Sequence, residues 1–197
     1  MDLPIFPLNG AVLFPGTSLP LNIFEKRYIE MIDYSLTRNR LIGMIQTDEN
    51  KNLHKVGCVG KIHSFNETVD GRYLISLQGI NCFTVNRELN ENYTFRIVNA
   101  HNIKNDEIND YFNENEKNNL INKYKDYIIL KNINLDLGEI EKIELTQLMK
   151  FIAMVSPFND IDKQVLLETK NLREFYIKLL SIIDLELVGD FSNDTIN

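Results

Sequence analysis

The sequence contains no tryptophan, only two cysteines and no long hydrophobic run. Cys58 and Cys82 are too few for a disulfide framework or a cysteine-rich zinc site, and their apolar surroundings predict buried thiols. No stretch approaches the roughly 20 apolar residues of a membrane span, and the start of the chain lacks the basic flank and cleavage site of a signal peptide. We therefore expect a cytoplasmic protein with no membrane partner.

The common catalytic motifs are also absent. The chain contains no GxxxxGK[ST] phosphate loop, no GxGxxG, no HExxH and no GxSxG. His54, His63 and His101 have no carboxylate or cysteine at a suitable spacing, so we interpret them as surface or structural residues. Cys58 and His63 would point to opposite faces of a regular strand, which argues against a metal pair. We therefore predict a protein that is not an enzyme and that uses no metal or other cofactor.

Charge is distributed unevenly along the chain. Residues 1–105 hold 11 Lys and Arg against 10 Asp and Glu, whereas residues 106–197 hold 10 against 18. Nucleic-acid binding relies on clustered positive charge, which neither half supplies. The net charge of −7 therefore argues against a nucleic-acid partner.

Hydrophobic residues alternate with a period of two up to about residue 104, which predicts an antiparallel sheet. One helix interrupts this pattern, with Asn22 as its predicted N-cap and Glu25 three residues later. The predicted strands are 3–6, 19–23, 41–46, 56–65, 73–78, 83–86 and 93–97. Many short strands are typical of a barrel or a sandwich.

After residue 105 the hydrophobic period becomes helical. Leu120, Tyr124 and Ile128 are predicted to share one helix face, and a second helix is predicted to bury Leu148, Phe151, Ile152 and Val155. Asn171 and Glu174 repeat the cap pattern at the start of the last helix. We place the boundary in the polar stretch 102–119 and predict an α+β protein. Its predicted parts are a β-rich domain with one helix (1–105), a C-terminal helical bundle (106–191) and a tail (192–197).

The most informative segment is residues 5–32. Together with Pro4 it holds four of the five prolines, so it runs along sheet edges and turns before it enters the helix. It also carries more apolar side chains than a surface loop usually does. Part of this set belongs to the core, and part is a candidate groove for an extended apolar segment of another chain, with unpaired edge backbone beside it.

This segment resembles the start of the N-terminal substrate-recognition domain of Lon, an ATP-dependent bacterial protease. The matching residues are Leu3-Pro4, Ile5-Phe6-Pro7-Leu8, Val12-Leu13-Phe14-Pro15-Gly16, Leu19-Pro20-Leu21 and Ile23-Phe24-Glu25-Lys26-Arg27-Tyr28. Further matches are Gly57-Cys58-Val59-Gly60, Gly71-Arg72-Tyr73, Leu77-Gln78-Gly79 and Gln164-Val165-Leu166-Leu167-Glu168. Asn81 stands where the family has an arginine. The ATPase and Ser/Lys peptidase motifs of the full protease are not in the sequence, so the chain is similar to the Lon-domain-only bacterial proteins.

The resemblance implies a PUA-like pseudo-barrel followed by a helical bundle, and a docking surface for unfolded or damaged polypeptide. It also suggests a protease as a second partner, with this chain as adaptor. The polypeptide-binding residues predicted for this surface are Phe14, Pro15, Ile23, Phe24 and Tyr28, with Glu25, Lys26 and Arg27 as a charged rim. The alternative is that the aromatic residues are core and the charges a solvated first helical turn.

A second hypothesis takes the PUA-like architecture as an RNA reader. It would depend on a local basic face within the neutral half of the chain. The residues available for such a face are Lys26, Arg27, Arg38, Arg40 and Lys61.

Overall fold

The computed structural model describes residues 1–89, 92–103, 111–135, 138 and 141–193. The chain divides into two compact units, which we call the β unit (residues 1–105 and 157–168) and the helical unit (residues 106–156 and 169–197). The sequence predicted a bundle that runs without interruption from 106 to 191, but residues 157–168 pack with the β unit instead. Part of the predicted tail, residues 194–197, lies outside the described residues. Among the described helices, none is both long and apolar enough to cross a membrane.

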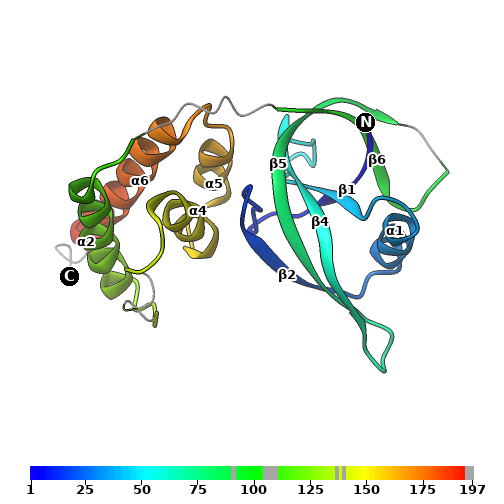
Figure 1. Ribbon diagram of the computed structural model, residues 1–197, viewed down its shortest axis with the longest axis horizontal. Coiled ribbons are helices and arrows are strands. Elements are labelled where there is room, and N and C mark those ends of the chain that lie inside the picture. Colours follow the sequence, from blue (N-terminus) through cyan, green and yellow to red (C-terminus); the bar gives the residue numbers. More distant parts are fainter. Residues whose placement is uncertain (90–91, 104–110, 136–137, 139–140, 194–197) are drawn as a thin grey trace. The chain divides into compact units, whose positions relative to one another are not determined.

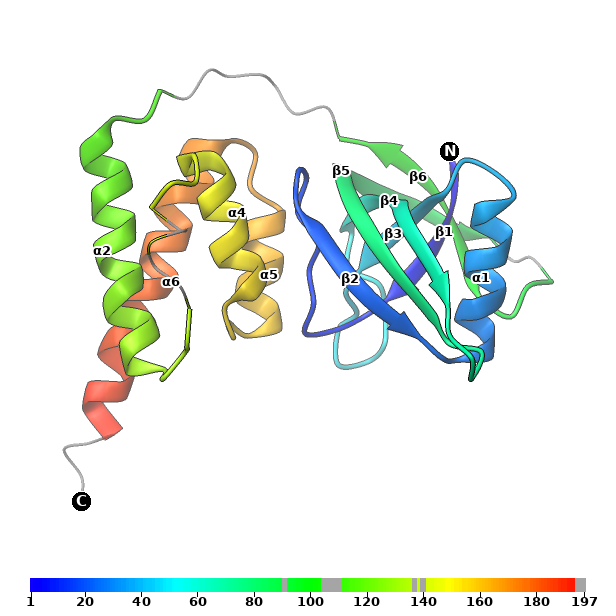
Figure 2. The ribbon, with the colours of Figure 1, turned by 60° about the horizontal axis from the view of Figure 1, so that its bottom comes forward.

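The described residues of the β unit form six strands and two helices. The strands are β1 (Asp2–Pro7), β2 (Ser18–Ile23), β3 (Leu41–Ile45), β4 (Val56–Glu67), β5 (Tyr73–Leu89) and β6 (Arg96–Asn102), and the helices are α1 (Lys26–Leu36) and α5 (Asp160–Leu167). The strand order is β2-β5-β4-β3-β1-β6, and an additional pairing of β5 with β6 closes the ring. Only β1 and β3 run parallel among these pairs. The result is a five-stranded barrel in which β2 pairs with the first half of β5, on the same edge that β6 pairs with farther along (Figures 1 and 2).

Two predicted strands, 73–78 and 83–86, form a single strand, β5. Gly79 lies between them and does not end the strand. A Cβ at Gly79 would lie 2.1 Å from the backbone oxygen of Phe14, so glycine is required for the close approach of the two chains. Thr17 N–H donates to Phe14 O (3.1 Å) across Pro15 and Gly16, and Gly16 has φ of 85°, as a type II turn requires. The proline turn is thereby fixed against β5.

The core of the barrel consists of side chains from five strands. It contains Leu3, Ile5, Ile45, Val59, Phe83, Val98 and Ala100. Cys58 and Cys82 are buried thiols, as predicted, and they lie opposite each other on β4 and β5. The Cys82 Sγ lies 3.8 Å from the Leu167 oxygen of α5, so this pair lies on the face of the sheet that α5 covers.

Helix α5 is fixed to the barrel by buried glutamines. The Gln46 side-chain amide donates to Gln164 Oε1 (3.2 Å) and to Asp160 O (3.1 Å). The Gln164 amide in turn donates to Val56 O (3.1 Å). Because both glutamines are buried, these bonds satisfy amide N–H groups whose burial would otherwise be costly, whereas Gln46 Oε1 has no partner among the described residues. They give a physical reason why α5 belongs to the β unit.

Helix α1 starts three residues later than a cap at Asn22 would allow. The predicted N-cap is wrong because Asn22 is a residue of β2 and pairs with Leu74. Glu25 occupies the N-cap position without a side-chain cap hydrogen bond. The strand pairing of β2 therefore overrides the local capping pattern.

The helical unit contains α2 (Glu114–Leu130), α4 (Leu145–Val155) and α6 (Leu172–Asn193). The predicted face of α2 is buried at Leu120, Tyr124 and Ile128. The predicted cap of α6 is confirmed, because Asn171 Oδ1 accepts the N–H of Glu174 at 2.7 Å. On α4 the buried face is centred on Leu148 and Ile152, whereas Val155, predicted on the same face, is exposed.

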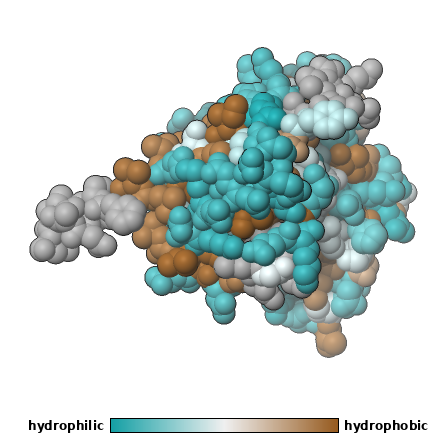
Figure 3. All heavy atoms as spheres, turned by 60° about the vertical axis from the view of Figure 1, so that its left-hand side comes forward, coloured by the Kyte–Doolittle hydropathy of each residue, from teal (hydrophilic) through white to brown (hydrophobic). Residues whose placement is uncertain are grey.

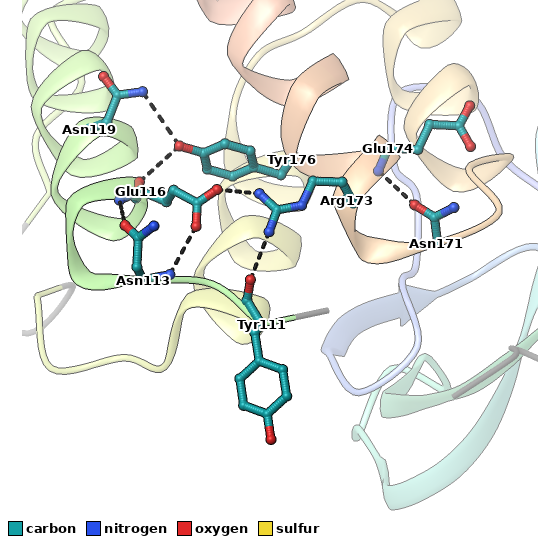
Figure 4. Close-up of polar contacts among 8 residues, drawn as sticks. All are labelled: Tyr111, Asn113, Glu116, Asn119, Asn171, Arg173, Glu174 and Tyr176. Carbon is teal, nitrogen blue, oxygen red and sulfur yellow. Dashed lines mark hydrogen bonds and ion pairs between the residues drawn. The ribbon is translucent and has the colours of Figure 1, made fainter. Parts of the chain in front are cut away.

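A polar cluster, which we call the α6 cluster, joins the starts of α2 and α6 (Figure 4). Its members are Tyr111, Phe112, Asn113, Glu116, Asn119, Arg173 and Tyr176. Arg173 pairs with Glu116 and donates to Tyr111 O (2.7 Å). The Tyr176 hydroxyl donates to Glu116 O (3.0 Å) and accepts from the Asn119 amide (3.4 Å).

The exposed face of the helical unit is largely polar. Figure 3 shows hydrophilic side chains over the centre of this face and hydrophobic ones gathered toward its rim. The exposed hydrophobic residues of this unit include Ile129, Ile177, Leu185 and Val188. The polarity of this face is consistent with the many acidic residues in the second half of the chain.

Candidate functional site

The eight predicted binding residues divide by burial. Phe14 and Ile23 are only 1% and 2% exposed, so their predicted contact with a polypeptide does not fit the structure. Phe14 is held in the proline turn, and Ile23 ends β2 opposite Tyr73. Pro15 is half-buried in the same turn. These residues belong to the scaffold, which was the alternative stated for the aromatic residues.

Phe24 is different, because 66% of its surface is exposed. It follows directly on β2, next to the end of the β4–β5 hairpin. Three further exposed hydrophobic residues, Phe65, Val69 and Leu74, lie at this hairpin end. Leu74 is opposite Asn22 and Asn66, whereas Phe65 is opposite Ile75 and lies on the other face of the hairpin, with its ring 4.8 Å from that of Tyr73. We call Phe24, Val69 and Leu74 the hairpin surface.

Arg27 and Tyr28 line a cleft of about 360 Å³, which we call the α1 cleft. The other lining residues are Pro7, Leu8 and Asn9 after β1, Thr47 and Lys51 after β3, and Thr94, Phe95 and Arg96 at the start of β6. The strands β1, β3 and β6 are neighbours in the barrel, and the first turn of α1 completes the cleft. Sequence reasoning identified only Arg27 and Tyr28 of this set.

Ion pairs hold two of the cationic side chains of the α1 cleft. Arg27 pairs with Glu25 (2.7 Å), and its guanidinium lies 4.5 Å from the centre of the Tyr28 ring. Arg96 donates to both carboxylate oxygens of Glu88, at 2.6 and 2.7 Å. These hydrogen bonds hold the pKa of Glu88 below its usual value. Burial raises the pKa of the Tyr28 phenol above its ordinary value, against the opposing effect of the Arg27 charge.

The edge strand β2 is a poor template for adding another strand. Thr17 O accepts the N–H of Gly79 (2.8 Å). In an antiparallel pair the backbone groups alternate, so the N–H and C=O groups of the odd-numbered residues point to β5 and those of the even-numbered residues point to the open edge. Pro20 is therefore at the centre of the open edge and has no N–H to offer. Side-chain contacts, more than backbone pairing, are available for binding here.

The residues of the RNA hypothesis do not form one patch. Lys26 and Arg27 begin α1, whereas Arg38 and Arg40 follow its end, about 16 Å away along an 11-residue helix. Lys61 is near the second group, because the adjacent Ile62 donates to Arg40 O. Within the described part of the chain, no group of three or more metal-ligating residues occurs.

Comparisons with known proteins agree with this architecture. Residues 2–184 match the family of ATP-dependent protease La (LON) substrate-binding domains. The Lon protease of Buchnera aphidicola is 26% identical over 201 residues, which covers 95% of this chain and 25% of the relative. The Lon protease of Flavobacterium johnsoniae is 30% identical over 98 residues, or 46% of this chain and 12% of the relative. The chain thus spans a quarter or less of the length of these proteases.

Two solved structures share the fold. A Lon N-terminal domain protein from Xanthomonas campestris superposes with a TM-score of 0.68 at 18% identity and covers 92% of this chain and 98% of its own. The N-terminal domain of the Mycobacterium avium complex Lon protease has a TM-score of 0.66 at 15% identity, covering 93% and 98%.

Proposed function

Since the chain belongs to the family of ATP-dependent protease La (LON) substrate-binding domains, we propose that it is a non-enzymatic module for unfolded polypeptide. In this proposal the hairpin surface takes up exposed hydrophobic segments of unfolded or damaged proteins. The observation that carries it is the 66% exposure of Phe24 beside further exposed hydrophobic side chains. Burying such a side chain in a complex contributes about 1.5–3 kcal/mol before ordering costs.

The predicted residues take different roles in this proposal. Phe24 makes the apolar contact, and Glu25, Lys26 and Arg27 form the charged rim. Phe14, Pro15 and Ile23 hold the backbone that presents them, and Tyr28, whose ring packs against Phe6, lines the α1 cleft. This division follows from burial and position and gives each group its own expected phenotype.

The test is fluorescence anisotropy with a labelled protein kept unfolded by reduction and alkylation of its cysteines. We expect saturable binding of this probe and no binding of its folded form or of single-stranded RNA. Phe24→Ser should weaken binding by about tenfold without lowering the unfolding temperature, because the side chain is already in water. Binding that is unchanged in Phe24→Ser would refute the proposal.

Two further variants separate contact from scaffold. Ile161→Ser on α5 is the matched control, since Ile161 is 73% exposed in the same unit, and it should leave binding unchanged. Phe14→Ala removes a fully buried ring and should destabilise the β unit by about 3–5 kcal/mol. Loss of binding in Phe14→Ala should therefore accompany loss of folding.

We also propose that the chain acts as an adaptor that presents bound segments to a protease. The names of the sequence relatives support a protease as partner. The chain alone should not degrade labelled casein, with or without ATP. Any turnover by the purified chain would contradict the non-enzymatic part of the proposal.

A further inference from the structure

The α1 cleft is positively charged in a protein whose net charge is −7. Three of its lining residues, Arg27, Lys51 and Arg96, are cations, and no lining residue is acidic. Glu25 and Glu88 hold the two arginines without lining the cleft. The lining of the cleft is therefore cationic, with two of its three cations paired to carboxylates outside the lining.

Arg27 and Arg96 each have N–H donors that their ion pairs do not use. A guanidinium group has five N–H donors. Glu88 uses Nε and Nη2 of Arg96, and Glu25 uses the same two nitrogens of Arg27. Among the described residues, neither Nη1 has a hydrogen-bond partner. Two oriented donor groups thus remain for an anion.

Lys51 is placed by a structured turn. Its N–H donates to Asp48 O (2.9 Å), and Asp48 also accepts from the backbone and side chain of Asn52 (2.8 and 2.9 Å). Lys51 has φ of 65°, a conformation that costs a non-glycine residue free energy. Its ammonium group forms no ion pair within the part of the chain that the structure describes. The turn therefore presents an uncompensated charge at the cleft.

Tyr28 adds an unused donor. The residue is 8% exposed, with its ring 4.3 Å from that of Phe6, so it is more than nine-tenths buried. Its hydroxyl makes no hydrogen bond to any described residue, and this oxygen is not among the fully buried unpaired atoms, so it is accessible from the cleft. An unpaired hydroxyl donor beside two guanidinium groups is complementary to an acceptor that carries negative charge.

We propose that the α1 cleft binds a carboxylate group of the bound polypeptide, through Lys51, the Tyr28 hydroxyl and the free Nη1 groups of Arg27 and Arg96. This inference rests on the proposed function. It adds that the bound polypeptide is recognised by a carboxylate group as well as by its hydrophobic segment. Pro7, Leu8 and Phe95 supply apolar walls for the side chain next to the carboxylate. The volume of about 360 Å³ suits a residue or two, and the acidic chain disfavours a polyanion such as RNA.

The carboxylate has two sources, the C-terminus of a polypeptide and an Asp or Glu side chain. Three labelled peptides of one hydrophobic sequence distinguish them: a free C-terminal acid, its C-terminal amide, and the amide with one Asp added. Anisotropy titrations should show about tenfold weaker binding of the plain amide than of the acid. Recovery with the Asp peptide identifies any carboxylate as sufficient, and no recovery identifies the C-terminus as the source.

Variants of the lining residues test whether the preference for the acid peptide depends on the α1 cleft. Lys51→Gln and Tyr28→Phe should each reduce the ratio of acid to amide affinity severalfold. Lys61→Gln, which removes an exposed lysine of β4 outside the cleft, should not. Inorganic phosphate and single-stranded RNA are added as competitors, and stronger binding of either than of the acid peptide would overturn the carboxylate assignment.

The outcome is separable from that of the hairpin surface. Equal affinities for acid and amide, together with Phe24-dependent binding of the unfolded probe, would overturn this inference and leave the proposed function intact. Failure of the unfolded probe to bind at all would overturn both.

Discussion

The α1 cleft and the α6 cluster use the same residue types in opposite ways. In the α6 cluster, Arg173 and Tyr176 each bond to α2 or to the residues before it, and the Tyr176 hydroxyl both donates and accepts. In the α1 cleft, the Tyr28 hydroxyl and the Lys51 ammonium bond to nothing among the described residues. A polar cluster that satisfies itself stabilises the fold, whereas one that does not retains hydrogen-bonding capacity for a ligand.

Among changes in the two polar clusters, the largest expected effect comes from Arg173→Met. The variant removes the ion pair with Glu116, the hydrogen bond to Tyr111 O and the contact with the Phe112 ring, whose centre is 4.3 Å from the guanidinium carbon. We expect the unfolding temperature of the helical unit to fall by about 5 °C. Hydrogen exchange should accelerate in α2 and α6 and stay unchanged in β1 and β3, and peptide binding should persist. Loss of peptide binding with an intact helical unit would show that the α6 cluster also contributes to binding, which contradicts the role assigned to it.

Acid should weaken the same cluster. The backbone N–H of Asn113, and secondly Arg173, hold the pKa of Glu116 below its ordinary value of 4.5. A carboxyl group with a lowered pKa contributes stability above its unfolded pKa and loses it as the pH falls through the folded one. The helical unit should therefore lose stability as the pH falls below about 4.5, as followed by helical circular dichroism during thermal unfolding. Glu116→Gln should flatten this dependence, and an unchanged profile would contradict the assignment.

The strand pattern was predictable because alternation is a local property. Most of the predicted strands correspond to observed ones, but 93–97 is wrong for its first half, since β6 begins at Arg96. The cap at Asn22 was wrong because strand pairing with Leu74 is a nonlocal effect. The position of 157–168 was equally beyond sequence pattern, because it depends on the bond between Gln46 and Gln164.

The candidate site was predictable only where it is continuous in sequence. Phe24, Arg27 and Tyr28 belong to one motif, whereas Lys51 and Arg96 reach the α1 cleft through the closure of the barrel. The turn around Lys51, with Asp48 and Asn52, was a usable local signal for a structured loop. Nothing local in the sequence relates that turn to α1.

The smallest effects come from two matched substitutions, Tyr176→Phe and Tyr28→Phe. Tyr176→Phe leaves Glu116 O and the Asn119 amide without their hydroxyl partner, so the free energy of unfolding of the helical unit should fall by about 1 kcal/mol. Peptide binding should be unaffected. Chemical denaturation monitored by tyrosine fluorescence and helical circular dichroism measures the change.

Tyr28→Phe removes a hydroxyl group that has no protein partner among the described residues, so it should leave stability unchanged within about 0.5 kcal/mol. Deleting this hydroxyl removes no hydrogen bond to the described residues, and the ring keeps its contact with Phe6. The same variant should lower carboxylate binding. Tyr28→Phe is thus expected to change binding but not stability, whereas Tyr176→Phe is expected to change stability but not binding. If Tyr28→Phe destabilises the β unit as much as Tyr176→Phe destabilises the helical unit, the Tyr28 hydroxyl has a structural role and the distinction between the two polar clusters fails.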